Sequence, residues 1–281
     1  MAKIVNESQR LAVSIVVHNS SLRDLDRSLE ALGIAVKEAQ RENCLNDVRI
    51  TMIDNASDQE YLKELKALLQ HCQNTGGVVV ELIQCAGNLG YGQGHNVAGN
   101  NNEDFRLILN PDVFLARDSL SQALNFVKEN PEVGVVVPRV LDSDGDVDYL
   151  CKRYPSILDL ALRGFAPVWL QKMFTKRLHR YEMRDIDWTK PHCQVELASG
   201  CCLLMRGEVW LALGGFSPDY FMYFEDFDLS MRAKEITTIA YVPEFEVTHL
   251  GGNAARKGWR HILWFIKSAW VFFNKYGWRF W

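Results

Sequence analysis

Two short polar clusters in this sequence carry side chains suited to acid, base or metal chemistry. In DYFMYFEDFDLSMRA (219–233), Glu225, Asp226 and Asp228 directly follow apolar and aromatic residues. Asp228 lies four residues before Arg232 and can pair with it on one helix face. Glu225 and Asp226 remain beside the aromatic residues, where partial desolvation raises the basicity of a carboxylate and suits it to act as a general base. The simpler interpretation is an acidic first helical turn, which the helix dipole favours.

The second cluster is NPDVFL, in which Asn110 and Asp112 follow an apolar run. Asp112 can ligate a hard divalent cation together with substrate phosphates, and Asn110 can bond a hydroxyl. Asn-Pro-Asp is also good turn chemistry without any ligand. In IDNASD, Asp54 can accept hydrogen bonds from a base or ribose, while Ser57 or Asp58 caps the next helix.

A glycine-rich stretch and one histidine complete the candidates. GNLGYGQGHNVAGN (87–100) has five glycines, which let the backbone approach a phosphate, and a helix starting at about Gln93 would point amide groups at it. No Gly-Lys-Ser/Thr follows, so it is not a P-loop, and a flexible surface loop is the alternative. His249, in EVTHLGG, is weak evidence alone, since a lone histidine is more often a packing residue than a ligand.

The elements that must position these residues alternate between strand and helix through the first half of the chain. Apolar β-branched runs predict strands at 11–19, 48–57, 77–84, 105–115 and 133–140. Helical periodicity fills most of the intervals, as in Leu22, Leu25, Leu29 and Leu32. This alternation predicts an α/β fold with a mostly parallel, Rossmann-like sheet flanked by helices. Ligands bind beyond the carboxyl ends of such strands, and the polar residues HN, DNAS and NPD follow three of them.

The second half of the chain has a different pattern. Residues 151–193 are basic and aromatic without strand alternation, whereas 201–216 reads as a strand and a helix closed by Gly214 and Gly215. Residues 251–281 hold six Lys or Arg, five Trp and no acidic residue, with apolar residues at helical spacing. Such a helix can lie in a membrane interface or pack on the core with its basic stems outward.

Composition limits the classes of protein. A chain of 281 residues with 48% hydrophobic residues suits one large domain or a domain with an appendage. A net charge of −4 gives no basis for non-specific nucleic-acid binding. Seven cysteines without a C-x-x-C pair indicate a reducing compartment and no zinc site. No apolar run has the length of a signal peptide or a membrane span, so we expect a cytoplasmic protein.

Six motifs in order make the chain resemble the family 2 glycosyltransferases, inverting enzymes of the GT-A fold. They are VSIVVHN, IDNASD, NLGYGQGHN, LILNPDVFL, SGCCLLMRGEVWLALGGFSPDYFMYFEDFDLSMRA and VTHLGG. The chain looks most similar to bacterial rhamnosyltransferases of surface polysaccharide or O-antigen synthesis. The resemblance implies a catalytic domain at 1–250, with a donor-binding half to about 140 and an acceptor and base half after it. A helical segment at 251–281 would follow.

The resemblance also implies roles for individual residues. Asp226 would be the catalytic base, with Tyr223 and Glu225 on the acceptor side. The donor would be bound by Asp54, Asn88, Gly90, Asn96, Asn110 and Asp112. A divalent metal, Mg²⁺ or Mn²⁺, would be held by Asp112 and His249. Asn110 departs from the first Asp of the family's D-x-D motif, which leaves the metal dependent on Asp112.

The implied reaction is transfer of L-rhamnose from dTDP-L-rhamnose to a glycan or polyprenyl-diphosphate-linked acceptor. The enzyme would act at the cytoplasmic face of the inner membrane, with residues 256–281 on the lipid surface. Related enzymes use UDP-linked hexoses or galactofuranose, and these donors stay open, as does a non-catalytic glycan-binding scaffold. A nucleotidyltransferase would need a glycine-rich loop with Arg and Lys after the first strand, where this chain reads VVHNSSLRDL.

Overall fold

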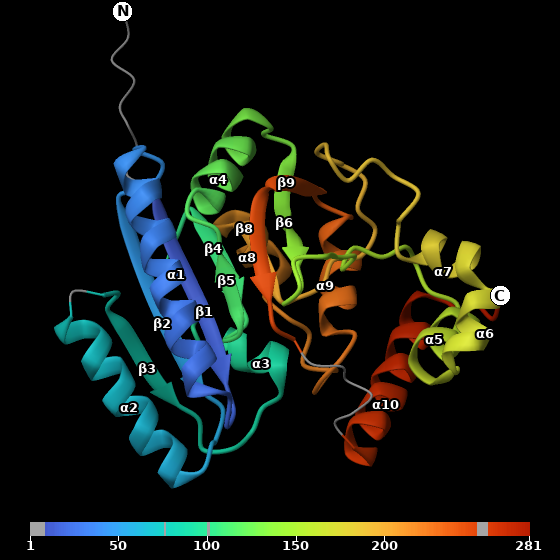
Figure 1. The fold of residues 1–281 in the computed structure, drawn as a ribbon, viewed down its shortest axis with the longest axis horizontal. Helices are drawn as coiled ribbons and strands as arrows, with labels where there is room; N and C mark the ends of the chain where they lie inside the picture. The colour runs from blue at the N-terminus through green and yellow to red at the C-terminus, as the bar shows by residue number, and fades with distance from the viewer. Residues whose placement is uncertain (1–8, 76, 100–101, 252–257) are drawn as a thin grey trace, which may run out of the picture.

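The computed structural model describes residues 9–75, 77–99, 102–251 and 258–281. Four parallel strands form one half of its sheet, in the order β3-β2-β1-β4 (Figure 1). Their bounds are Arg10–Val17 for β1, Asp47–Asp54 for β2, Val80–Gln84 for β3 and Phe105–Leu109 for β4. The intervening helices are α1 (Leu22–Arg41), α2 (Gln59–Asn74) and α3 (Tyr91–Asn96). This half confirms the predicted alternation of strand and helix.

The sheet continues with strands of mixed direction. Strand β8 (Cys202–Arg206) pairs antiparallel with both β4 and β6 (Val133–Leu141), and β6 pairs parallel with β9 (Thr238–His249). The predicted strand 105–115 is two strands, because the Asn-Pro-Asp turn separates β4 from β5 (Val113–Leu115). Strand β5 pairs antiparallel with β9 instead, and the two-residue strand β7 (Val147–Asp148) pairs with β6.

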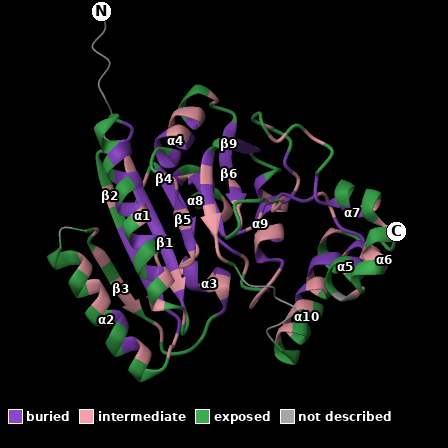
Figure 2. Ribbon diagram, viewed as in Figure 1, coloured by how far each residue is buried: buried purple, intermediate pink, exposed green. Residues whose placement is uncertain are grey.

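Apolar cores cover both faces of the sheet. In β4, Leu107 and Leu109 join the core under α1 and α4 (Ser119–Glu129), while Ile108 between them joins the core on the other face. That second core includes Trp210 of α8 (Gly207–Leu213) and Leu229 of α9 (Glu225–Ala233). Helix α8 ends at Gly214 with a left-handed φ of 66°, as the glycine pair predicts. The buried residues, drawn purple in Figure 2, lie mainly along the sheet and on the helix faces that cover it.

A third core joins the C-terminal helix to the rest of the fold. Helices α5 (Ile157–Phe165), α6 (Val168–Met173) and α7 (Thr175–Tyr181) lie at the same end of the molecule as α10 (Trp259–Tyr276) (Figure 1). Phe272 and Phe273 of α10 are fully buried against Tyr220 and Phe224. One face of α10 therefore packs on the core, which was one of the two alternatives predicted for this helix. Arg256 and Lys257 lie outside the described residues.

The opposite face of α10 stays open to solvent. Its exposed apolar residues, together with those of α6, include Val168, Trp169, Met173, Trp259, Leu263, Ile266 and Trp270. These seven residues are called the apolar surface below. Among the helices that the structure describes, none combines the length and hydrophobicity needed to cross a membrane.

Candidate active site

Asp226 occupies the first turn of α9, where backbone amides hold its carboxylate. Its Oδ2 accepts a hydrogen bond from the Gly200 N–H at 3.0 Å, and its Oδ1 accepts one from the Phe227 N–H at 2.9 Å. Burial raises the pKa of Asp226, and these two amides offset part of that rise. The side chain is half-buried. The carboxylate is thus fixed in direction and more basic than an exposed aspartate.

Glu225, the neighbouring carboxyl, is held differently. It is 5% exposed, and its Oε2 has no hydrogen-bond partner among the described residues. Burial, followed by repulsion from Asp226, raises the pKa of Glu225 well above its ordinary range. Repulsion between two carboxylates acts on both, but two backbone amides stabilise the ionised form of Asp226, whereas Oε2 of Glu225 has no donor among the described residues. This difference favours ionisation of Asp226 while the proton stays on Glu225.

The loop before α9 is strained and α10 holds it in place. Tyr223 and Phe224 have consecutive left-handed φ angles of 69° and 65°, which cost on the order of 1–3 kcal/mol each for such residues. Phe224 is buried in the core shared with α10, and the Tyr223 hydroxyl lies 2.9 Å from Nδ1 of His261. Contacts from α10 therefore stabilise the backbone that aims Glu225 and Asp226.

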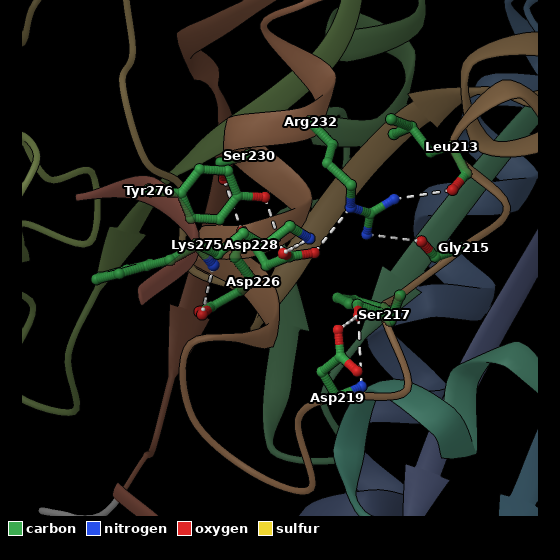
Figure 3. A network of polar contacts seen from close by, with 12 residues as sticks. Leu213, Gly215, Ser217, Asp219, Asp226, Asp228, Ser230, Arg232, Lys275 and Tyr276 are labelled. Atoms are coloured by element: carbon green, nitrogen blue, oxygen red, sulfur yellow. Dashed lines mark hydrogen bonds and ion pairs between the residues drawn. The ribbon is translucent and has the colours of Figure 1, made fainter. Parts of the chain in front are cut away.

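Asp228 fastens α9 to α10 directly. Its fully buried carboxylate accepts hydrogen bonds from Arg232 Nε at 2.7 Å, Lys275 Nζ at 2.7 Å and the Tyr276 hydroxyl at 2.8 Å (Figure 3). Burial favours a higher pKa for Asp228, but these donors lower the pKa below its usual range. The predicted pair with Arg232 is confirmed, and the two partners from α10 are additional.

The segment SGCC connects Asp226, the predicted base, to the Asn-Pro-Asp turn. Gly200 donates its N–H to Asp226 and accepts the Tyr91 hydroxyl at its carbonyl. The next carbonyl, of Cys201, accepts the Asn110 N–H at 2.8 Å. Since neighbouring Cα atoms are about 3.8 Å apart, one short segment holds both parts of the site. Sequence reasoning assigned no role to these residues, although a glycine beside a strand is a signal of close backbone approach.

Asp112 and His249 come together through strand pairing. Val113 lies opposite His249 in the β5–β9 ladder, and the Asp112 Oδ1 is 3.4 Å from the His249 Nε2. Gly251 gives the imidazole room, because an added Cβ would lie 2.3 Å from the ring. Asn110 Oδ1 is buried without a hydrogen-bond partner in the described part of the chain. These donors fit a divalent cation.

The cation would depend on few protein ligands. Within residues 9–75, 77–99, 102–251 and 258–281, no group of three or more His, Cys, Asp or Glu side chains could hold a metal. Two protein ligands with substrate phosphates completing the shell is a common arrangement for such cations. The metal assignment of Asp112 and His249 stays a prediction that this geometry supports.

The glycine-rich loop packs tightly on the loop before α9. Gly90 has a φ of 82°, and a Cβ there would lie 1.9 Å from the carbonyl oxygen of Phe221. The same carbonyl accepts the Tyr91 N–H at 3.0 Å. Asn88 Oδ1 accepts the Gly90 N–H at 2.9 Å and shapes the turn. Only glycine fits position 90, and the contact joins the predicted donor loop to the loop that carries Asp226.

Asp54 and Asn96 already make structural hydrogen bonds. The Asn96 amide exchanges two bonds of 2.9 Å with the backbone of Phe216. Asp54 is 2% exposed at the end of β2, and its Oδ1 accepts the Ser57 N–H at 3.1 Å. Both residues therefore build the loops around the predicted donor site, and their contacts to a donor stay predictions.

A cavity of about 350 Å³ opens beside Asp226. Glu225, Asp226 and Tyr223 contribute to one part of its wall, and His261 and Phe265 of α10 contribute to another. The acceptor-side candidates Tyr223 and Glu225 thus share a cavity with the predicted base. Lys152 and Arg163, which the sequence did not single out, also line it.

Comparison with known proteins places the chain in a class of enzyme. No family model matches it. It is 28% identical over 268 residues to an N-acetylglucosaminyl-diphospho-decaprenol L-rhamnosyltransferase of Mycobacterium tuberculosis, covering 88% of this chain and 79% of the relative. It is 25% identical over 232 residues to the rhamnosyltransferase WbbL of Escherichia coli, covering 76% of this chain and 83% of the relative.

The fold agrees with these relatives. A mannosyltransferase from Pyrobaculum calidifontis, solved with GDP-mannose and Mn²⁺, superposes with a TM-score of 0.57 at 15% identity. The alignment covers 93% of this chain but 61% of the solved one, so the chain spans less than two thirds of that structure. Fold and relatives together make this protein a glycosyltransferase of the GT-A fold. Within that class it is related to the bacterial rhamnosyltransferases.

Proposed function

We propose that this chain transfers L-rhamnose from dTDP-L-rhamnose, with inversion, to a sugar acceptor linked to a polyprenyl diphosphate, in surface-polysaccharide synthesis. The relatives named as rhamnosyltransferases support the donor sugar, and the name of the mycobacterial relative supports the lipid-linked acceptor. The observation that carries the proposal is the carboxylate of Asp226. It is fixed by two backbone amides at the wall of a cavity and is made more basic by burial.

In this mechanism the acceptor hydroxyl lies in the cavity against Asp226. The carboxylate takes the hydroxyl proton while the acceptor oxygen forms its bond to the anomeric carbon, and the bond to the nucleoside diphosphate breaks on the opposite face. No covalent sugar–enzyme intermediate is needed, so a single base is sufficient. Glu225 remains protonated beside it and can donate a hydrogen bond to an acceptor oxygen.

Asp112 and His249 would hold Mg²⁺ or Mn²⁺ beside the donor diphosphate, with Asn110 close by. When bound, such a cation supplies Lewis-acid stabilisation of the leaving diphosphate. The role of the protein is to bring the two ligands together through the β5–β9 ladder and to leave space at Gly251 for the imidazole. The donor loop at Gly90 then lies against the loop that carries the base.

The proposal is tested with the Asp226→Asn variant and a labelled nucleotide sugar. We expect transfer to fall by at least a hundredfold, since a positioned base contributes about 10²–10⁴ to the rate. Binding of dTDP with Mn²⁺ should stay within twofold of wild type, because the substitution keeps the shape of the side chain. Retention of most turnover would remove Asp226 from the role of base.

The donor is identified by comparing stabilisation by nucleotide sugars in the presence of Mn²⁺. A bound ligand raises the unfolding temperature by mass action. The panel contains dTDP-L-rhamnose, UDP-glucose and UDP-galactofuranose. Preferential stabilisation and turnover with either UDP sugar would replace rhamnose in the proposal and leave the mechanism intact.

The apolar surface of α6 and α10 supports membrane association as a further part of this proposal. Its exposed tryptophans and aliphatic residues suit the lipid interface, and the exposed Lys172, Arg260 and Lys267 suit anionic headgroups. An Ile266→Glu, Trp270→Glu double variant should lose flotation with phosphatidylglycerol vesicles. Leu211→Glu, at an exposed position on α8, is the control that should float like wild type. Equal flotation of all three proteins would contradict membrane binding through this surface.

A further inference from the structure

A group of positive charges lies on the same cavity as the predicted base. Lys152 and Arg163 line the cavity, and together with Arg184 they surround one carboxylate. Glu182 lies 3.6 Å from Lys152 Nζ, 3.0 Å from Arg163 Nε and 2.7 Å from Arg184 Nε. Three cations thus contact one carboxylate. The exposed Asp148 also lies nearby and offsets only part of the excess positive charge.

Lys152 is buried, which makes this excess charge costly. Its side chain is 6% exposed, whereas that of Arg163 is 48% exposed. Burial, followed by repulsion from Arg163, lowers the pKa of Lys152 to about 8. A buried charge is stable when it is paired and hydrogen-bonded. Lys152 Nζ also donates a hydrogen bond to the Tyr149 carbonyl, but that oxygen carries no full charge. An anion bound between Lys152 and Arg163 would therefore add charge pairing that Glu182 divides among three cations.

Backbone hydrogen bonds position Lys152 relative to Asp226. Lys152 exchanges two backbone hydrogen bonds with Leu197, at 2.8 and 3.0 Å. Leu197 precedes by three residues the Gly200 whose N–H holds the predicted base. One short segment therefore contacts both Lys152 and Asp226, and Arg163 of α5 lines the same cavity.

The cavity has the size and chemistry for one sugar that carries a phosphate. Its volume of about 350 Å³ is near the lower end of the roughly 300–1,000 Å³ of small-molecule sites. Besides the charged groups, Leu160, Ile262 and Phe265 line it with apolar surface. Glu225 also lines the cavity. The carboxyls suit the hydroxyls of a sugar, the cations suit a phosphate, and the apolar residues suit a hydrocarbon chain.

We propose that Lys152 and Arg163 form a subsite for a phosphate group of the acceptor, next to the sugar whose hydroxyl faces Asp226. This inference rests on the proposed function for the identity of the acceptor. The fork of Arg163 suits two phosphate oxygens, and Lys152 contributes a point charge from the buried side. The subsite would fix the distance between the phosphate and the reactive hydroxyl, and so select which hydroxyl is glycosylated.

The test measures binding of farnesyl diphosphate, which has the diphosphate and hydrocarbon chain but no sugar. Calorimetric titration is done without donor and without metal, so it needs no turnover and stays informative if the proposed reaction is wrong. Arg163→Gln should raise the Kd about tenfold or more, the effect of losing a charge-assisted hydrogen bond. Lys152→Met should do the same, and farnesol should bind weakly and equally to all variants.

Arg180→Gln is the matched control, because Arg180 is exposed on α7 and does not line the cavity. It removes the same charge and should leave the Kd unchanged. Arg163 is half exposed, so its variant is expected to fold and carries the test alone if Lys152→Met is unstable. Unchanged farnesyl diphosphate binding by Arg163→Gln would overturn the subsite.

Two further outcomes would also overturn it. If Arg163→Gln instead weakened dTDP binding with Mn²⁺, the cations would serve the donor. If it reduced flotation with phosphatidylglycerol vesicles but not farnesyl diphosphate binding, they would serve membrane headgroups. Failure of transfer with all donors, together with intact farnesyl diphosphate binding that depends on Arg163, would refute the proposed reaction and keep the subsite.

Discussion

The Glu225→Gln variant distinguishes the roles of Glu225 and Asp226 through its stability and its activity. The folded protein holds the pKa of Glu225 above its ordinary value of 4.5, chiefly through burial. A raised folded pKa means that the stability present at low pH is lost as the pH rises from about 4.5 through the folded pKa. The variant has no such loss. Each unit of pKa corresponds to about 1.4 kcal/mol, so the rise from 4.5 to about 8 would favour the variant by a few kcal/mol.

Urea unfolding of wild type and Glu225→Gln between pH 4 and pH 8 measures this difference. We expect the free energies of unfolding to converge near pH 4 and to separate in favour of the variant as the pH rises. A difference that does not depend on pH would refute the assignment of the raised pKa to Glu225. The Gln side chain keeps the size of Glu, so packing contributes equally at every pH.

The activity of the same variant tests the order of ionisation. Because Asp226 ionises while Glu225 is protonated, the acid limb of kcat/KM should keep its midpoint in Glu225→Gln. That midpoint should lie above the usual range of an aspartate, since burial raises the pKa of Asp226. If Glu225→Gln lost as much transfer as Asp226→Asn, the two carboxyls would have exchanged roles.

Three further predictions concern the parts that hold the site together. Asp228→Asn should lower the free energy of unfolding in urea by about 3 kcal/mol, because it breaks a buried charge network. Lys275→Met, which removes a partner that is 40% exposed, should cost about 1 kcal/mol or less, and equal losses would contradict the network. Gly90→Ala should lower the melting temperature and the transfer rate, since its Cβ would meet the Phe221 carbonyl. Gly145→Ala is the control for backbone strain alone, because Gly145 has a φ of 87° and open space around it. Equal effects of the two variants would show that the contact between Gly90 and Phe221 is unimportant. EDTA should abolish transfer and Mn²⁺ restore it, and His249→Ala should need at least about tenfold more Mn²⁺; an unchanged Mn²⁺ requirement would remove the histidine from the metal site.

Local patterns predicted much of this fold. Periodicity located the parallel strands and the helices between them, because each buries one face against a neighbour. The glycine pair ended α8 at Gly214, and the spacing of four residues paired Asp228 with Arg232, as expected. Both features depend on residues within one helix or at its end, which is the range over which sequence spacing fixes geometry.

Long-range partners were beyond such patterns. The Tyr91 hydroxyl bonds the Gly200 carbonyl 109 residues away, and Lys275 reaches Asp228 across 47 residues. The run of aromatic residues before α9 predicts apolar surface beside Glu225 and Asp226, but not what that surface packs against. In the structure Phe221 packs on Trp264, with ring centroids 4.9 Å apart, and Phe224 is 4% exposed in the core with α10. An aromatic side chain can serve a ligand or a neighbouring helix equally well, and only the tertiary fold decides between them.

The attachment of α10 to Asp228 has a consequence for how the enzyme is made. Helix α9 leaves the ribosome before α10, and until then its buried aspartate has Arg232 as its only partner of the three. The strained turn at Tyr223 and Phe224 also lacks its support during this interval. Premature termination between the two helices would therefore yield a polypeptide whose loop before α9 and buried Asp228 lack their partners from α10. Such a fragment would be a target for proteolysis.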